Sequence, residues 1–319
     1  MRGPAIAVAA TGALMTAHAR AEEPAVWKFG YGSNMSQQNL RQKKQLNPLG
    51  SRRTVVRGFS LSFPAGRGID FVEPAFATLK RDPEGEVHGV SCLLCRTDAD
   101  SLDRQEGAYG IEVCRARVYD DDASESLDVE VYVPGRPLPR DHPEGCCSQR
   151  YKDLLVRGAV ENDLDAAWIA KLRALPVYTP SQSTLSMRAA LPAPSELPQM
   201  SIEQLRAHNG SGRDCLVSAC GFIFKHTPIF SSYRGRDVTF RNLLHLRGIN
   251  IDANDDGGQS PFPNLAQLTS AELEYCLQNR DRLMHKSEGG PVAVLREFWE
   301  EQDYELKGIF SGNSLSRRE

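Results

Sequence analysis

The 319-residue sequence lacks any apolar run that approaches the ~20 residues a helix needs to cross a bilayer. It also lacks an excess of basic charge, because 38 Lys and Arg against 41 Asp and Glu give a formal net charge of −3. The first absence argues against a transmembrane protein. The second gives no reason to expect binding to nucleic acid or to an anionic membrane surface. We therefore expect neither nucleic acid nor a membrane as a partner.

A metal-binding cysteine pattern is also missing. Cys92 and Cys95 form a CxxC, but no second CxxC and no nearby pair of histidines accompanies it. The two lie in an apolar run that is typical of a strand, where residues three apart point to opposite sides. Cys146 and Cys147 are adjacent, and vicinal cysteines bridge only with strain. We expect Cys92 and Cys95 to lie in the core, Cys146 and Cys147 to be free thiols, and no metal to be bound. Free thiols favour a reducing compartment.

The N-terminal stretch differs from the rest of the chain. Arg2 precedes an alanine-rich stretch at 5–17, and residues 19–21 have the small-x-small form of a signal cleavage site. The absence of acids before Glu22 fits a transit peptide equally well, and a disordered tail or an over-extended start is a third interpretation. All three stay open. We expect a cytoplasmic location, with an organellar or secreted one left open by residues 1–21.

The length suits about two domains at a typical ~150 residues each. A change in composition after Pro180, to a stretch rich in Pro and Ser, is typical of a linker. We predict a signal-like, transit-like or disordered segment at 1–24, a first domain at 25–180, a linker at 181–200 and a second domain at 201–319.

The hydrophobic pattern predicts an α+β first domain and a mainly helical second domain. β-branched and aromatic runs separated by Gly, Pro and Asp clusters predict strands at 27–31, 54–63, 75–79, 87–95, 111–119 and 127–133. Apolar residues at three- and four-residue spacing predict helices at 35–44, 149–161 and 165–175, with a helical turn at 101–106. In the second domain we expect a buried apolar segment at 215–224 and helices at 238–246, 270–284 and 291–301.

One segment near the start of the first domain has features of a binding loop. Residues 29–35, Phe-Gly-Tyr-Gly-Ser-Asn-Met, run from a strand through two glycines into a predicted helix. Glycines let a ligand approach the backbone, and the start of a helix presents free N–H groups that favour carboxylate or carbonyl oxygens. Taken alone, a tight turn capped by Ser or Asn explains the segment better. No Gly-Lys-Ser/Thr follows, so it is not a phosphate loop.

A second segment, Leu102-Asp103-Arg104-Gln105-Glu106-Gly107, would alone indicate only an acidic surface turn. This segment follows Tyr-Gly-Ser-Asn-Met by about seventy residues, however, and the two motifs in this order and at this spacing resemble those of the γ-glutamylcyclotransferase family. The resemblance continues at 77–79 and 86–90, and again at Ser148-x-x-Tyr151 and 158–162. Cys147 stands where the family usually has proline before that serine. The blocks together span roughly 150 residues.

The resemblance implies a small mixed β-barrel flanked by helices. It also implies a lyase that converts a γ-glutamyl amino acid, peptide or amine into 5-oxoproline and the free amine, without a cofactor or a metal. Glu106 would be the general acid/base. By the same resemblance, the substrate-binding residues would be Phe29, Gly30, Tyr31, Gly32, Ser33, Asn34, Tyr151 and, with less support from the pattern, Tyr132.

Two alternatives to this function stay open. One is a γ-glutamylamine cyclotransferase of a biosynthetic pathway. The other is a non-catalytic γ-glutamyl-binding protein that acts through the C-terminal domain. In each case the expected partner is a small γ-glutamyl compound, and a homodimer stays open. The sequence determines neither the leaving amine nor a role for residues 201–319, although Asn34 argues mildly against the glutathione-specific branch of the family.

Overall fold

The computed structural model describes residues 24–107, 109–119, 125–139, 141–211, 214–228, 231–247, 262–287 and 289–302. Its chain divides into two compact units. Among the described residues, the first unit takes those up to Ala65, Phe76–Gly145 and Tyr151–Leu175. The second unit takes Gly66–Ala75, Cys146–Arg150 and those from Pro176 onward. The segment predicted at 1–24 lies, except for its last residue, outside the described residues.

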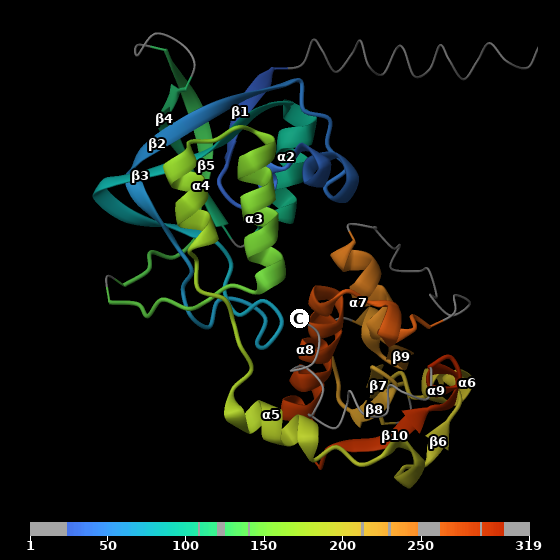
Figure 1. Ribbon diagram of the computed structural model, residues 1–319. Coiled ribbons are helices and arrows are strands. Elements are labelled where there is room, and N and C mark those ends of the chain that lie inside the picture. Colours follow the sequence, from blue (N-terminus) through green and yellow to red (C-terminus); the bar gives the residue numbers. More distant parts are fainter. Residues whose placement is uncertain are drawn as a thin grey trace, which may run out of the picture. The chain divides into compact units, whose positions relative to one another are not determined.

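The first unit is built on a closed five-stranded barrel with the strand order β1-β3-β2-β4-β5 (Figure 1). Strand β1 pairs in parallel with β5, and the other neighbours pair antiparallel, so the barrel is mixed. This confirms the fold class that the sequence indicated for this part of the chain. The strands are β1 Ala25–Gly30, β2 Gly50–Ser62, β3 Thr78–Cys95, β4 Tyr109–Val118 and β5 Ser126–Pro134.

Strand β3 joins two segments that the sequence predicted as separate strands. Its pairing with β2 passes from Glu86 directly to Arg81, so that the Asp-Pro-Glu-Gly segment between them has no partner in β2. Opposite this point Gly58 of β2 has a φ of +86°. A glycine is suited to this bulge because it adopts a positive φ at little cost. The turn-like residues at 82–85 therefore interrupt the pairing without ending the strand.

Helices α2 Arg96–Gln105, α3 Gln149–Glu161 and α4 Ala166–Arg173 lie around the barrel (Figure 1). The helix predicted at 35–44 is a 3-10 turn, η1 Ser33–Met35, followed by a short π-helix, η2 Asn39–Lys43. The wider winding of η2 shows in the bond from Lys44 N to the carbonyl of Asn39, five residues earlier, at 3.0 Å. Residue spacing alone could not distinguish this winding from an α-helix.

The barrel core fixes the strand ends that carry the candidate site. Phe29 of β1, Leu79 of β3 and Val131 of β5 are all buried. Leu102 of α2 and Leu155 of α3 are buried as well. Removing such side chains from water contributes about 1.5–3 kcal/mol each. The helices are therefore held against the barrel by their own apolar stripes.

The second unit contains helices close to those expected at 238–246 and 270–284 and, in addition, a five-stranded sheet with the order β6-β10-β8-β7-β9. This sheet was not predicted, because strands of two to five residues carry almost no periodic signal. Its strands are β6 Gln199–Met200, β7 Leu216–Ala219, β8 Phe222–Lys225, β9 Arg236–Asp237 and β10 Pro291–Leu295. Its α-helices are α5 Gln182–Ala189, α6 Ile202–Arg206, α7 Thr239–Leu246, α8 Ser270–Lys286 and α9 Arg296–Glu300.

The predicted helix at 291–301 is wrong over its first half. Residues 291–295 form β10, which pairs in parallel with β6 and antiparallel with β8, and only Arg296–Glu300 is helical. Val292 and Val294 are β-branched and suit a strand, but the apolar spacing of the segment also fits a helix. The neighbouring strands decide between the two.

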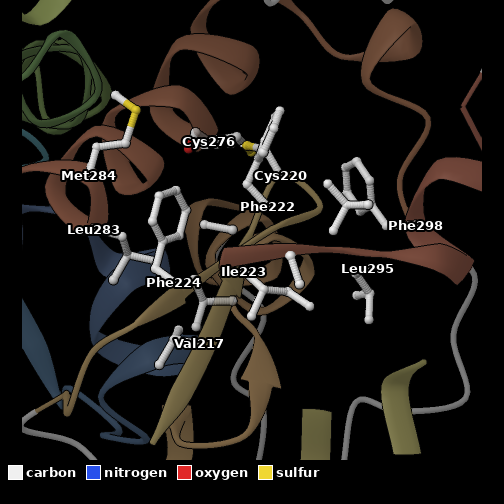
Figure 2. Close-up of a cluster of buried hydrophobic side chains, with 14 of the residues drawn as sticks. Val217, Cys220, Phe222, Ile223, Phe224, Cys276, Leu283, Met284, Leu295 and Phe298 are labelled. Carbon is white, nitrogen blue, oxygen red and sulfur yellow. Dashed lines mark hydrogen bonds between the residues drawn. The ribbon is translucent and has the colours of Figure 1, made fainter. Parts of the chain in front are cut away.

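The apolar segment predicted at 215–224 forms the centre of the second core. Strands β7 and β8 are joined by a two-residue turn in which Cys220 and Gly221 have φ values of +49° and +72°. A turn with two positive φ values suits the right-handed twist of a hairpin. Figure 2 shows side chains from this hairpin gathered with Leu283, Met284 and Phe298. Cys220 and Cys276 are buried among them.

The Pro- and Ser-rich segment predicted as a linker is ordered and belongs to the second unit. Helix α5 begins after Ser181, whose Oγ accepts a hydrogen bond from Thr184 N at 3.2 Å. Strand β6 then joins the sheet at Gln199 and Met200. Arg188 on α5 is 5% exposed. The Pro and Ser content of this segment predicted a linker. Composition could not reveal the burial of Arg188, because that burial depends on partners from elsewhere in the chain.

The cysteines behave as the sequence predicted. All eight are free thiols, and Cys92 and Cys95 are both buried in β3. Burial raises the pKa of the Cys92 thiol to about 11, so it stays protonated near neutral pH. Among the described helices, none is long and apolar enough to cross a membrane. The described residues also include no cluster of three or more His, Cys, Asp and Glu that could hold a metal ion.

Candidate active site

The glycine turn after β1 folds back on the end of its own strand. A Cβ placed on Gly30 would lie 2.6 Å from the carbonyl oxygen of Asn34 and 3.0 Å from Met35 N. A Cβ on Gly32 would lie 3.1 Å from the hydroxyl of Tyr151. Real Cβ contacts are almost never that short against backbone atoms. The turn therefore requires glycine at position 30 for close approach.

We expect Gly30→Ala to destabilise the protein by about 1–3 kcal/mol, because the added methyl group has to displace Asn34 and the start of η1. Urea unfolding of the full chain would measure this loss. Gly50→Ala is the matched control, since a Cβ at Gly50 meets nothing within 4 Å. Equal stability of the two variants would contradict the tight approach at Gly30.

Glu106 stands where α2 ends and the chain turns into β4. Its N–H donates to the carbonyl of Leu102 at 2.9 Å, and its own carbonyl accepts from Tyr109 N at 2.8 Å. The carboxylate oxygen Oε1 accepts from Asn34 Nδ2 at 3.1 Å and from Lys44 Nζ at 2.8 Å. The Glu106 side chain is 17% exposed. The two segments that the sequence singled out thus meet through Asn34 and Glu106.

Tyrosines line the same end of the barrel. Tyr31 is 5% exposed, and its hydroxyl donates to the carbonyl of Tyr132 at 2.7 Å. Burial raises the pKa of Tyr31 well above its ordinary value, and nearby Tyr109, Tyr151 and the Glu106 carboxylate raise it further. Burial and the Glu106 charge also raise the pKa of Tyr109. These phenols therefore stay neutral and can donate hydrogen bonds.

A buried lysine connects α2 to the barrel beneath the site. Lys28 of β1 is 3% exposed, and its Nζ contacts Asp103 Oδ1 at 2.6 Å and also pairs with the Glu130 carboxylate. Tyr132 donates its hydroxyl hydrogen to the same Asp103 oxygen at 2.6 Å. Burial and then this hydrogen bond raise the pKa of Tyr132. Asp103, three residues before Glu106, therefore fixes α2 to β1 and β5.

The other predicted residues are distributed between this site and the core. Phe29 is 1% exposed and packs in the core. Its ring lies so close to Gly89 that a Cβ on that glycine would be 2.7 Å from the ring atoms. Tyr151 stacks edge-on against Phe76 at 5.5 Å between ring centroids, with its hydroxyl next to Gly32. Ser33 contributes its carbonyl, which accepts from Asn39 Nδ2 at 3.1 Å.

Sequence reasoning missed four side chains at or beneath this end of the barrel. Tyr109 lies just beyond the second motif, and Asp103 is a member of that motif to which the pattern gave no role of its own. No pattern pointed to Lys44, because the intervening turn and π-helix determine where residue 44 lies. Lys28 was read as part of a buried strand, with no role of its own. A buried lysine in an apolar strand is the signal that could have found it, since such a charge needs partners.

The chain is similar in sequence to two proteins named γ-glutamyl cyclotransferase. No family model matches the chain. Over 177 residues it is 28% identical to the γ-glutamyl cyclotransferase aclK of Aspergillus oryzae, which is 50% of this chain and 64% of that protein. Over 155 residues it is 26% identical to the γ-glutamyl cyclotransferase gliK of Claviceps purpurea, covering 46% and 68% of the two. The resemblance to γ-glutamylcyclotransferases is confirmed for about half the chain. The match to aclK spans less than two thirds of that protein's length.

Solved structures match the chain with low scores. A human protein described as uncharacterized protein loc79017 has a TM-score of 0.42 and 22% identity, over 50% of this chain and 94% of its own. A structure named γ-glutamyl cyclotransferase has the same score and identity, over 50% and 93%. The sequence relatives show that the γ-glutamylcyclotransferase-like region accounts for about half the chain, and the remainder is an extension.

Proposed function

We propose that the protein is a γ-glutamylcyclotransferase that converts a γ-glutamyl amino acid, peptide or amine into 5-oxoproline and the free amine, with Glu106 as general acid/base. One observation carries the proposal: the Glu106 carboxylate lies within hydrogen-bonding distance of the glycine turn, at 3.1 Å from Asn34 Nδ2, beside neutral tyrosines. Relatives named γ-glutamyl cyclotransferase support a function of this family.

The attacking nitrogen loses two protons in the reaction, and the leaving nitrogen gains protons. The substrate α-ammonium first loses one proton, the resulting amine attacks its own γ-carbonyl to close a five-membered ring, and the same nitrogen loses a second proton as the ring amide forms. The bond between the γ-carbon and the leaving nitrogen breaks, and that nitrogen gains one of these protons to leave as an amine, which takes up a second proton from solvent to become ammonium. A single carboxylate can carry the proton between the two, which is worth about 10²–10⁴-fold in rate. The partial burial of the Glu106 side chain, which is 17% exposed, supports this role.

The tetrahedral intermediate also carries a negative oxygen that needs fixed donors. Within the described residues, the backbone N–H groups of Gly32, Ser33 and Asn34 donate no hydrogen bond. They lie on the same turn that Glu106 contacts through Asn34. Losing one donor of this kind typically costs about 10²–10³-fold in rate. We assign these N–H groups to the oxyanion, and the neutral hydroxyl groups of the tyrosines to substrate orientation.

The test is an assay for 5-oxoproline with the full chain and three substrates: γ-glutamyl-alanine, glutathione and a γ-glutamylamine. We expect 5-oxoproline and the free amine in equal amounts from at least one of them. Product from the γ-glutamylamine alone would favour the amine-specific alternative. Saturable binding without product from all three would overturn the proposal in favour of a non-catalytic binding protein.

The full chain is needed because two segments inserted in the first unit's sequence pack within the second unit. Phe71 stacks on His285 with ring centroids 4.4 Å apart, and the Arg150 guanidinium lies 5.6 Å from the centre of the Tyr275 ring. A truncated chain ending near Thr179 would remove both partners. Loss of activity in such a fragment would not reveal whether Glu106 is catalytic.

A further inference from the structure

We propose that Lys44 is a positioning residue for this reaction: its ammonium holds Glu106 as a carboxylate and anchors Oε1, which leaves Oε2 as the oxygen that exchanges the proton. The inference rests on the proposed function and adds a residue that lies outside both sequence motifs. Three features of the structure carry it: the ion pair itself, the distribution of donors over the two carboxylate oxygens, and the way the lysine backbone is fixed.

The ion pair is short and largely shielded from solvent. Lys44 Nζ lies 2.8 Å from Glu106 Oε1, and the two side chains are 15% and 17% exposed. A charge-assisted hydrogen bond of this length is about twice as strong as a neutral one. Solvent screens a pair at this depth less than it screens a surface pair. The ammonium therefore favours the ionised carboxylate, which is the form that can accept a proton.

The two carboxylate oxygens have different surroundings. Oε1 accepts from both Lys44 Nζ and Asn34 Nδ2. Within the part of the chain that the structure describes, Oε2 accepts no hydrogen bond. Both lone pairs of Oε1 are engaged by these two donors, so a proton on Oε1 would break at least one of the bonds, whereas a proton on Oε2 would break neither. Transfer from the substrate ammonium to Glu106, and then to the leaving nitrogen, is therefore assigned to Oε2.

Lys44 is itself held in place by the segment that carries Glu106. Its N–H donates to the carbonyl of Asn39 at 3.0 Å, at the end of η2. Its carbonyl accepts from Gln105 Nε2 at 3.1 Å, and Gln105 directly precedes Glu106. The lysine is thus tied to the end of α2 through its backbone and through its ammonium. A long exposed lysine would lose this alignment to side-chain motion.

The remaining titratable groups around Glu106 do not replace Lys44. Tyr31 from the glycine turn, Tyr109 from β4 and Tyr132 from β5 are the phenols whose pKa the Glu106 charge raises, so they are neutral near pH 7. The nearby Asp103 carboxylate is paired with Lys28. Removing the Lys44 charge therefore leaves Glu106 beside neutral phenols and a paired carboxylate.

The first test is the pH dependence of kcat/KM for 5-oxoproline release by Lys44→Met, Lys44→Arg and Arg41→Met. Methionine keeps much of the lysine stem but removes the charge, and an opposite charge at this range shifts carboxyl titration by about one unit or more. We expect the acidic limb of the K44M profile to lie at higher pH than that of the wild type, so that the loss in kcat/KM grows toward about tenfold as the pH falls below both limbs and disappears near pH ~8.5. K44R should retain the wild-type profile. R41M, an exposed position on η2, is the matched control.

A uniform loss in K44M at every pH, or an unchanged profile, would overturn the inference. The second test needs no turnover: a carbon-13 NMR titration of the Glu106 side-chain carboxyl in the full chain, with the signal assigned by comparison with Glu106→Gln. We expect this carboxyl to take up its proton at a higher pH in K44M than in the wild type, because the neighbouring positive charge has been removed. An unchanged midpoint would reject the role of Lys44, whereas a wild type without 5-oxoproline release would reject the proposed function.

Discussion

Glu106→Gln should reduce kcat for 5-oxoproline release by about 10²–10⁴-fold, with little change in KM. The amide is close to the carboxylate in size and shape, and its oxygen can still accept from Asn34 Nδ2 and Lys44 Nζ, as Glu106 Oε1 does. What it loses is the ability to take up and release a proton near neutral pH. A fall in kcat without a rise in KM is the expected sign of an interaction that matters in the transition state rather than in binding.

The matched control is Glu84→Gln, an exposed position in the unpaired segment of β3. It should retain wild-type turnover. The unfolding free energy of both variants, measured with urea, should lie within about 0.5 kcal/mol of the wild type. Neither change creates a cavity, and the amide oxygen of E106Q can still accept the hydrogen bonds that Glu106 accepts. If E106Q turned over like the wild type with its fold intact, Glu106 would not be the acid/base and the proposed mechanism would fail.

Arg188→Met should cost about 3–5 kcal/mol of unfolding free energy, whatever reaction the first unit performs. Arg188 Nε lies 2.9 Å from Asp281 Oδ2, and an Nη atom lies 2.6 Å from the same oxygen. That Nη also donates to Glu274 Oε1 at 2.9 Å. The Asp281 side chain is 0% exposed. Methionine would leave this carboxylate buried with the largest part of its compensation removed.

The loss should depend on pH with a definite sign. Burial raises the pKa of Asp281, and the hydrogen bonds from Arg188 oppose that rise. Without Arg188 the folded-state pKa should rise further. A carboxyl group whose pKa is higher in the folded state than in the unfolded state stabilises the fold at pH values below its unfolded-state pKa. This contribution is lost as the pH rises through the folded-state pKa. The R188M deficit should therefore be larger at neutral pH than under mildly acidic conditions.

Urea unfolding followed by circular dichroism would measure this deficit, and amide hydrogen exchange in α5 and α8 would locate it. Leu185→Ala, at an exposed position on α5, is the control and should fall within about 0.5 kcal/mol of the wild type. A wild-type melt for R188M would show that the Arg188–Asp281 pair contributes little to the stability of the second unit.

The sequence by itself determined most of the first unit. β-branched and aromatic runs between Gly, Pro and Asp clusters predicted its strands, because such side chains suit a pleated sheet and the clusters suit turns. The glycines at 30 and 32 predicted a close turn, and the spacing from that turn to Glu106 supported the family resemblance. Gln149–Glu161 was predicted with the bounds that α3 has, since its apolar stripe follows the helical period.

Only the tertiary structure decided which side chains meet. The Lys44–Glu106 and Lys28–Asp103 contacts join residues 62 and 75 positions apart, and no local period records such a distance. The short strands of the second unit and the burial of Arg188 in a Pro- and Ser-rich stretch were hidden for the same reason. Local pattern reports which face of a segment is apolar, whereas ion pairs and short strands depend on partners that folding brings from elsewhere in the chain.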